Sequence, residues 1–391
     1  MYIEKSSVPV MAVTLSITDP QTRAALNASL DKLIQTDNQL ATYPARYKEN
    51  EVILGGAGEL HLQKTLTQLR ALCPAIQVSA PYVLYRETVF EKSDSNIVAL
   101  SKSPNKANLF YGYAEPLSKA LMDAIDQGAI LNLSESECAA YLHNQHGWNL
   151  QEAQKIWSWG PTQNATNCLI DGTKGIAPIP DQVKQDCISA FKEVCQAGVL
   201  AEELLRGVKF VITNAILAST DRQRSFSQIN PTFQRFIRGL QLISVPRLLE
   251  AYYLLQLTIP TDSVPKVRAL LAAKRTIDLN DLEHKKAAYI PEHLSKDQVF
   301  LSVCQIVNTN ADDSTNTLLF HLPVAESFGL AEALETLTAN TAHAELTFSH
   351  WMAIQGDVFD PSLSASYIQA IRKRKNLREN IPPTDAYIDK L

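Results

Sequence analysis

The two ends of this 391-residue chain repeat one order of apolar patterns, and this repeat constrains the fold more than any other feature of the sequence. Residues 13–78 predict a strand, a helix, two strands, a helix and a closing strand, and residues 253–348 predict the same order again. This order is typical of the ferredoxin-like split βαβ sandwich. The sequence therefore predicts an α+β protein in which two such sandwiches flank a middle region.

Individual residues support each predicted element. In the first sandwich the strand pattern is followed directly by Asp19 and Pro20, a capping residue and a proline suited to the first position of a helix. In the second, Val264, Val267 and Leu271 recur at helical spacing after an alternating strand that ends at Ile259. The polar stretch 285–316 interrupts this second pattern, so we interpret it as an insertion.

The middle region, residues 81–245, mixes strand patterns with one clear helix at 188–198. After the second sandwich the chain predicts a further helix over 364–377, which carries a basic run. Such a run is usually a solvated helix face, but here we give a nucleic-acid contact more weight.

Composition sets limits on compartment and partners. The formal net charge is −5, so a nucleic-acid partner must be met by local basic patches rather than by a general cationic field. The six cysteines form no CxxC pair, a pattern that fits buried thiols in a reducing compartment. The sequence contains neither a signal-peptide core nor a membrane-length apolar run, so we expect a cytoplasmic protein without a membrane partner.

Short motifs follow one another along the chain. They are GAGELHL at 56–62, APYVLYRETV at 80–89, SPNK at 103–106, IWSWGP at 156–161, EELLRGVKF at 202–210, PRLLE at 246–250, LPVAESFG at 322–329, and the tail with HW, RKRK and DKL. In content and order they resemble the C-terminal half of eukaryotic and archaeal translation elongation factor two. The resemblance covers essentially the whole chain.

The resemblance implies a domain arrangement. It places a domain three over residues 1–79 and a domain four, with a fold similar to ribosomal protein S5, over 80–245. It places a domain five over 246–349, and the C-terminal part, 350–391, completes domain four. In that family, domain four reaches into the decoding site of the small ribosomal subunit, so the resemblance implies the ribosome, rRNA and ribosomal proteins as partners.

The motifs of a GTPase are absent from the sequence. No GxxxxGK[ST] phosphate loop occurs, and Asn105-Lys106-Ala107-Asn108 lacks the final Asp of a guanine-reading NKxD. The glycine turn at 55–58 lies between a strand and a helix, where a simple tight turn is the commoner explanation. We therefore expect no GTP site, no cofactor, no catalytic residue and no enzymatic activity in this chain, and a separately encoded GTPase subunit is one possible partner.

The tip of the predicted domain four departs from the family. There the family carries a histidine that becomes diphthamide, followed by Arg and three glycines, whereas this chain has Gln223 in the histidine position and Ser225, Phe226 and Ser227 in place of the glycines. Phe226 adds a face that can stack on a base, and basic residues surround it. The predicted ribosome-binding residues at the tip are Arg222, Gln223, Arg224, Phe226, Ser103, Pro104, Asn105 and Lys106; further basic candidates are Arg235, Arg238, Arg372, Lys373, Arg374 and Lys375.

No metal site is predicted. His143 and His146 follow Cys138, but a fourth ligand at suitable spacing is missing. The leading hypothesis is a ribosome-binding translation-factor module without its own GTPase and without the diphthamide acceptor. It leaves two alternatives open: a repurposed RNA- or protein-binding scaffold, and a ribosome-assembly or regulatory factor.

Overall fold

The computed structural model describes residues 8–17, 19–45, 48, 50–93, 99–162, 165–173, 179–274, 277–278 and 315–389. These residues form two compact units that alternate along the chain. Unit 1 comprises residues up to Leu84 together with Glu250–Met352, and unit 2 comprises Tyr85–Leu249 together with Ala353–Leu391. Most of the predicted insertion at 285–316 lies outside the described residues, and the predicted domain boundaries stay predictions.

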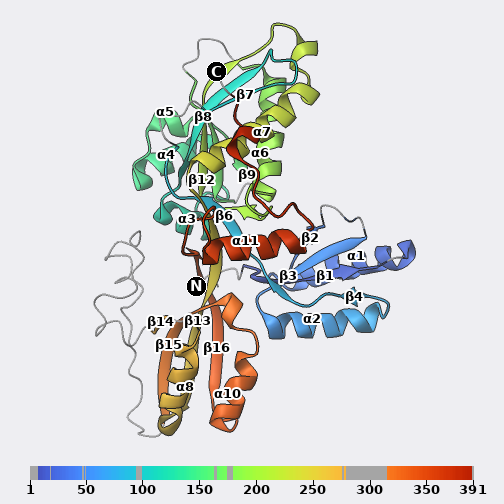
Figure 1. Ribbon diagram of the computed structural model, residues 1–391, viewed down its shortest axis with the longest axis vertical. Helices are drawn as coiled ribbons and strands as arrows, with labels where there is room; N and C mark the ends of the chain where they lie inside the picture. Colours follow the sequence, from blue (N-terminus) through green and yellow to red (C-terminus); the bar gives the residue numbers. More distant parts are fainter. Residues whose placement is uncertain are drawn as a thin grey trace. The chain divides into compact units, whose positions relative to one another are not determined.

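The first sandwich of unit 1 has the predicted order of elements. Its sheet runs β2-β3-β1-β4, with antiparallel neighbours, which is the strand order of a ferredoxin-like fold (Figure 1). The elements are β1 (Met11–Ser16), α1 (Pro20–Thr36), β2 (Ala41–Pro44), β3 (Glu51–Gly56), α2 (Glu59–Leu72), β4 (Gln77–Val78) and the short β5 (Tyr82–Val83), which also pairs with β1.

Helix α1 begins where the sequence predicts it. The carboxylate of Asp19 accepts a hydrogen bond from the backbone N–H of Thr22 at 2.8 Å, and Pro20 occupies the first turn. This cap satisfies one of the N–H groups that a helix start leaves without an intrahelical partner. Leu26 and Leu30 then point from α1 into the buried interior.

The second sandwich of unit 1 repeats this topology. Its strands lie in the order β14-β15-β13-β16, and Leu255, Leu257, Leu318 and Phe320 join one buried cluster with residues of the two helices. The elements are β13 (Pro246–Pro260, whose first residues belong to unit 2), α8 (Val264–Ala272), β14 (Ile277–Asp278), β15 (Thr315–Pro323), α10 (Leu330–Thr338) and β16 (His343–Ala353). The prediction of two ferredoxin-like sandwiches is confirmed.

Unit 2 is built on a sheet with strand order β7-β8-β12-β10-β9, in which β10 and β12 are parallel and the other neighbours are antiparallel. Helix α6 connects the two parallel strands, as such a connection requires. The strands are β7 (Leu100–Lys102), β8 (Leu109–Pro116), β9 (Ile156–Gly160), β10 (Asn167–Asp171) and β12 (Val208–Ile216). Two further strands, β6 (Arg86–Val89) and β11 (Leu204–Leu205), pair with each other.

Both faces of this sheet are covered by helices. Successive residues of β12 point to opposite faces, so Phe210 and Ile212 enter the core formed with α6 and α7, whereas Val211 enters the core formed with α3, α4 and α5. The helices of unit 2 are α3 (Lys119–Asp126), α4 (Glu135–His146), α5 (Leu150–Ala153), α6 (Asp181–Gln196), α7 (Phe226–Ile243) and α11 (Leu363–Arg374). The sequence predicted only α6 and α11 among these, with shifted ends.

A fully buried carboxylate connects several elements of unit 2. Glu87 of β6 accepts hydrogen bonds from the backbone N–H groups of Leu200, Ala201 and Glu203 at 2.8, 2.8 and 3.0 Å, and from Nε2 of Gln241 at 2.8 Å. Burial raises the pKa of Glu87, and these hydrogen bonds oppose that rise. A Cβ at Gly198 would lie 2.2 Å from the carboxylate, so only glycine fits there.

We expect Glu87→Gln to destabilise unit 2 by about 3 kcal/mol, because the amide turns an N–H₂ group toward backbone donors and leaves one of them buried without an acceptor. The free energy of unfolding in urea measures this. Glu91→Gln, at an exposed position nearby, is the matched control and should change stability by less than about 0.5 kcal/mol. Equal effects of the two substitutions would contradict the role given to Glu87.

Unit 1 contains a half-buried histidine, His321, whose pKa is lowered. Burial lowers the pKa of His321 on β15 from 6.5 to about 4. Its ring lies 4.8 Å from the ring of His350, which stacks on Tyr252, and Oγ of Ser349 is 3.5 Å from its Nε2. The native state therefore binds fewer protons at this group than the unfolded chain does.

This difference predicts that unit 1 loses stability as pH falls from 6.5 toward 4. A base with a depressed pKa stabilises the fold above its unfolded pKa, and the stabilisation is lost on acidification, by about 3 kcal/mol in all. His321→Gln should flatten this part of the pH profile of urea unfolding. A His321→Gln profile with the same slope as that of the unsubstituted protein would show that another group carries the pH dependence.

Candidate nucleic-acid interface

Two connections of unit 2 meet at one end of its sheet, which we call the tip. The turn 103–108 joins β7 to β8, and residues 217–225 join β12 to α7. The strand register brings them together, because Leu109 at the start of β8 pairs with both Lys102 and Ile216. The predicted tip residues from the two parts of the sequence therefore lie beside each other.

Two asparagines fasten these connections. Nδ2 of Asn105 and Nδ2 of Asn108 both donate to the backbone carbonyl of Gln223, at 2.7 and 2.8 Å. Oδ1 of Asn108, which is fully buried, accepts from the backbone N–H of Ala218 at 3.0 Å, and Oε1 of Gln228 accepts from the backbone N–H of Asn105 at 3.1 Å. The tip is thus a hydrogen-bonded platform that is built before any ligand arrives.

The backbone of the tip differs from the loop that the sequence suggested. Residues Asp221–Arg224 form a short 3₁₀ helix, η1, and α7 begins at Phe226, so Phe226 and Ser227 lie in the first turn of a helix. Without glycines, the chain here takes helical conformations that ordinary residues adopt easily. Oε1 of Gln223 accepts from Oγ1 of Thr220 at 3.0 Å, and its carbonyl is the point held by both asparagines.

The polar and aromatic side chains at the tip divide into exposed and internally bonded groups. Arg222, Lys106, Asn105 and Pro104 are exposed, and so is Phe226, whose side chain has 54% of its surface accessible. Arg224 instead donates to Oδ1 of Asp221, and Ser103 is buried beneath the turn. The cations best placed for a phosphate are therefore Lys106 and Arg222, on either side of the asparagine clamp.

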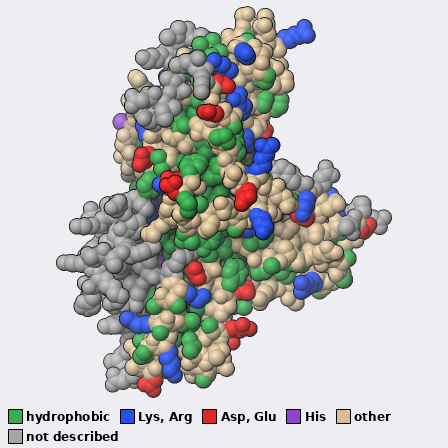
Figure 2. Space-filling view, viewed as in Figure 1, with side chains coloured by type: hydrophobic (Ala, Val, Ile, Leu, Met, Phe, Trp, Pro, Cys, Tyr) green, Lys and Arg blue, Asp and Glu red, His purple; other side chains and the backbone are tan. Residues whose placement is uncertain are grey.

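The remaining basic candidates have intramolecular partners or neighbours. Arg235 donates to the backbone carbonyl of Lys102 and to Oδ1 of Asp389, both at 3.3 Å, and Arg238 donates to Oε1 of Gln234 at 3.1 Å. Figure 2 shows Lys and Arg side chains interspersed with Asp and Glu on the face in view, rather than gathered in one field. A broad cationic surface is not what distinguishes the tip.

The basic run of α11 is largely built into the fold. Arg372 is buried and donates to the backbone carbonyls of Leu200, Arg378 and Asn380, at 2.6, 2.6 and 2.9 Å. Lys375 donates to the carbonyls of Ala201 and Glu202, and both Arg374 and Lys375 pair with Glu203. These contacts correct the expectation that Arg372 binds RNA, because its guanidinium donates to backbone carbonyls inside unit 2. Lys373, by contrast, is exposed.

One amide of the glycine turn of unit 1 is already bonded within the fold. The backbone N–H of Ala57 donates to Nδ1 of His61 at 3.1 Å, and the carbonyl of Ala57 accepts from the hydroxyl of Tyr253 at 2.6 Å. Nε2 of His61 lies 2.9 Å from Asp37, which fixes the ring so that Nδ1 can accept. This geometry supports the tight-turn interpretation over a phosphate site.

The described residues contain no cluster of three or more His, Cys, Asp or Glu side chains suited to a metal ion. Nδ1 of His143 lies 2.7 Å from the carbonyl of Trp148, and the ring of His146 packs on Tyr141. Burial raises the pKa of the Cys138, Cys168, Cys187 and Cys195 thiols, which suits inert side chains in a core. Among the same residues, no helix has the length and apolar character needed to cross a membrane.

Sequence reasoning missed the tail that lies along β7. The backbone N–H of Asp389 donates to the carbonyl of Leu100 at 2.8 Å, its carboxylate accepts from the N–H of Lys102 at 2.7 Å, and Oγ of Ser101 donates to the carbonyl of Tyr387. Gly239 of α7 permits this docking, since a Cβ there would lie 2.7 Å from Ile388. A glycine in the middle of a helical pattern was the one signal that could have indicated it.

Two family models match separate parts of this chain. Residues 130–242 match the family described as elongation factor G, domain IV, and residues 303–361 match the elongation factor G C-terminus. The first match contains η1 and α7 of the tip, and the second contains β15, α10 and β16. The chain thus carries an elongation-factor-like C-terminal region.

The asparagine clamp can be tested without changing the shape of a side chain. We expect Asn108→Asp to turn an oxygen toward the carbonyl of Gln223, which repels it, and to increase amide hydrogen exchange over residues 218–228 by about tenfold or more. Asn144→Asp, at an exposed position on α4, is the control and should leave exchange at the tip unchanged. Unchanged exchange in Asn108→Asp would mean that the clamp does not hold the tip.

Proposed function

We propose that this chain is a ribosome-binding module of the translation elongation factor type, related to the C-terminal half of eukaryotic and archaeal elongation factor two, whose tip contacts rRNA. The observation that carries the proposal is the tip itself, which lies at the end of unit 2, where residues 130–242 match elongation factor G, domain IV. There Lys106, Arg222 and Phe226 are exposed on a backbone fixed by Asn105 and Asn108. Two cations and an exposed ring suit phosphates and an unstacked base.

The module works by shape and charge and not by hydrolysis. The sequence has no phosphate loop, and in the glycine turn at 55–58 both backbone polar groups of Ala57 are bonded to His61 and Tyr253. We propose that the chain binds no GTP, needs no cofactor, and acts in the cytoplasm either beside a separately encoded GTPase or alone. Gln223 favours a role that does not depend on diphthamide, because a glutamine cannot receive that modification.

The tip contact is tested by ribosome co-sedimentation at several salt concentrations. The double variant Lys106→Asn and Arg222→Gln removes two charges, and asparagine tolerates the left-handed backbone of Lys106 (φ of 58°). We expect affinity to fall about tenfold and the slope of log K against log salt to shrink by about one per lost phosphate contact. Phe226→Ala should weaken binding without changing the slope.

The matched control is Lys119→Gln with Lys192→Gln, which removes the same charge near the other end of the sheet, after β8 and late in α6. It should bind as the unsubstituted protein does. Equal weakening by both double variants would show that only net charge matters, and absence of sedimentation at low salt would overturn ribosome binding altogether.

A fluorescent GTP analogue tests the absence of a nucleotide site. No stoichiometric binding is expected from this chain alone, and saturable one-to-one binding would contradict the proposal. Binding of purified rRNA fragments but not of ribosomes would favour the repurposed scaffold instead.

A further inference from the structure

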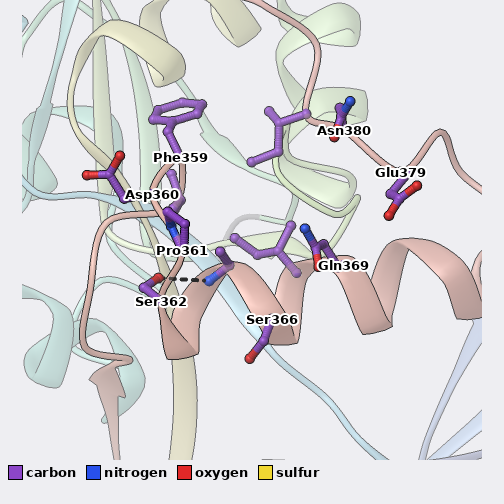
Figure 3. A pocket seen from close by; sticks show the side chains of 12 residues that line it. Phe359, Asp360, Pro361, Ser362, Ser366, Gln369, Glu379 and Asn380 are labelled. Carbon is purple, nitrogen blue, oxygen red and sulfur yellow. Dashed lines mark hydrogen bonds between the residues drawn. The ribbon is translucent and has the colours of Figure 1, made fainter.

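Unit 2 contains an open groove that is separate from the tip residues. It has a volume of about 690 Å³, within the range of small-ligand and peptide sites. One wall is the loop Val358–Ser362, the floor is the exposed side of the first turns of α11, and the other wall is the segment Glu379–Ile381 (Figure 3). Nothing in the proposed RNA contact uses these residues.

The first wall is held by a short hydrogen-bonded turn. The carboxylate of Asp357 accepts from the backbone N–H of Phe359 at 2.8 Å. Oγ of Ser362 donates to the carbonyl of Asp357 at 2.6 Å and accepts from the N–H of Ala365 at 3.1 Å, which also caps α11. The loop is therefore tied to the start of the helix that it faces.

The opposite wall is fixed by the buried Arg372. Its guanidinium donates to the carbonyls of Arg378 and Asn380, which ties this segment to α11. Because both walls are anchored to α11, the groove exists without an occupant, and binding does not have to order it.

The lining combines apolar surface with negative charge. Phe359, which leaves 57% of its surface exposed, supplies most of the apolar surface, with Pro361 and Ile381 beside it in the lining, whereas Val358 and Ile368 are buried beneath. Among the described residues that line the groove, Asp360 and Glu379 are the charged ones, and they lie at opposite ends of it in Figure 3. The rest of the lining is neutral and polar, including Ser366, Gln369 and Asn380.

This chemistry selects the occupant. Phosphates of a nucleic acid would meet two carboxylates and no cation, so RNA is disfavoured here although it suits the tip. A cationic side chain at each end and an apolar side chain over Phe359 would complement the groove. We propose that the groove binds a short segment of a partner protein in which an apolar residue is flanked by two basic residues.

Fluorescence anisotropy with labelled peptides tests this directly on the full chain. The probe GSRLKSG should bind, its uncharged counterpart GSQLQSG should bind at least about tenfold more weakly, and GSRSKSG, which lacks the apolar residue, should also lose affinity. The affinity of GSRLKSG should fall as salt rises, because the charges are exposed. Equal binding of the three peptides would overturn the proposal.

Matched variants locate the site. Asp360→Asn with Glu379→Gln should weaken GSRLKSG about tenfold and remove most of its salt dependence, and Phe359→Ala should weaken it with the salt dependence kept. All three positions are exposed, so the fold is retained. The control Glu91→Gln with Asp123→Asn removes the same charge elsewhere in unit 2 and should bind normally.

An unchanged affinity in the Asp360→Asn, Glu379→Gln variant would place the peptide elsewhere and refute the assignment. Displacement of the peptide from the groove by single-stranded RNA would refute it as well. Ribosome sedimentation of this variant should be unaltered, which separates failure of the groove from failure of the tip.

Discussion

The turn at residues 198–203 is the point on which unit 2 depends, because its backbone is buried and every polar group there needs a partner. Three of its N–H groups donate to the carboxylate of Glu87, and three of its carbonyls accept from Arg372 and Lys375. An acid from one part of the chain and bases from another thus satisfy the two sides of one turn. The peptide groups of the turn are hydrogen-bonded to the carboxylate of Glu87 on one side and to Arg372 and Lys375 on the other. None of these three side chains is therefore buried without hydrogen-bond partners.

This arrangement explains why basic residues of α11 that look like surface cations in the sequence are internal. A run of Arg and Lys at a helix end is normally solvated, and no local pattern shows that three carbonyls of the turn facing it accept hydrogen bonds from this run. The partner lies about 170 residues away in sequence, for example at |i−j| of 172 for the contact between Arg372 and Leu200. Periodicity and motif spacing say nothing about contacts between residues so far apart in the sequence.

Periodicity did predict the two sandwiches, since their strands and helices each bury a single face and therefore show a regular apolar spacing. Periodicity did not predict most of the helices of the middle region, and the physical reason differs from helix to helix. In α7 the spacing of Ile229, Phe233, Phe236 and Leu240 is helical, but Pro231 interrupts the pattern as a residue that disfavours a helix interior. Pro231 is the sixth residue of α7, beyond the four N–H groups that a helix start leaves without a partner, so it removes one hydrogen bond of the helix, and the burial of the flanking apolar residues outweighs that loss.

At the tip, the sequence identified the right two segments but not which side chains would be available. Arg224 pairs with Asp221, whereas Arg222 is exposed, and the sequence does not show this difference. A motif also does not show that the side-chain amides of Asn105 and Asn108 hold the carbonyl of Gln223. The fold thereby reduces a list of basic residues to a small exposed set.

The alternation of the two units along the chain has a consequence for biosynthesis. Unit 2 begins at Tyr85 but includes residues after Ala353, and unit 1 includes Glu250–Met352 in between. During synthesis the first sandwich can close before the later segments exist, yet unit 2 holds Glu87 without Arg372, and β7 without Asp389, until the segment after Ala353 has been made. During that interval the incomplete unit 2 exposes apolar surface and an unpaired strand edge, which makes it a natural client for chaperones.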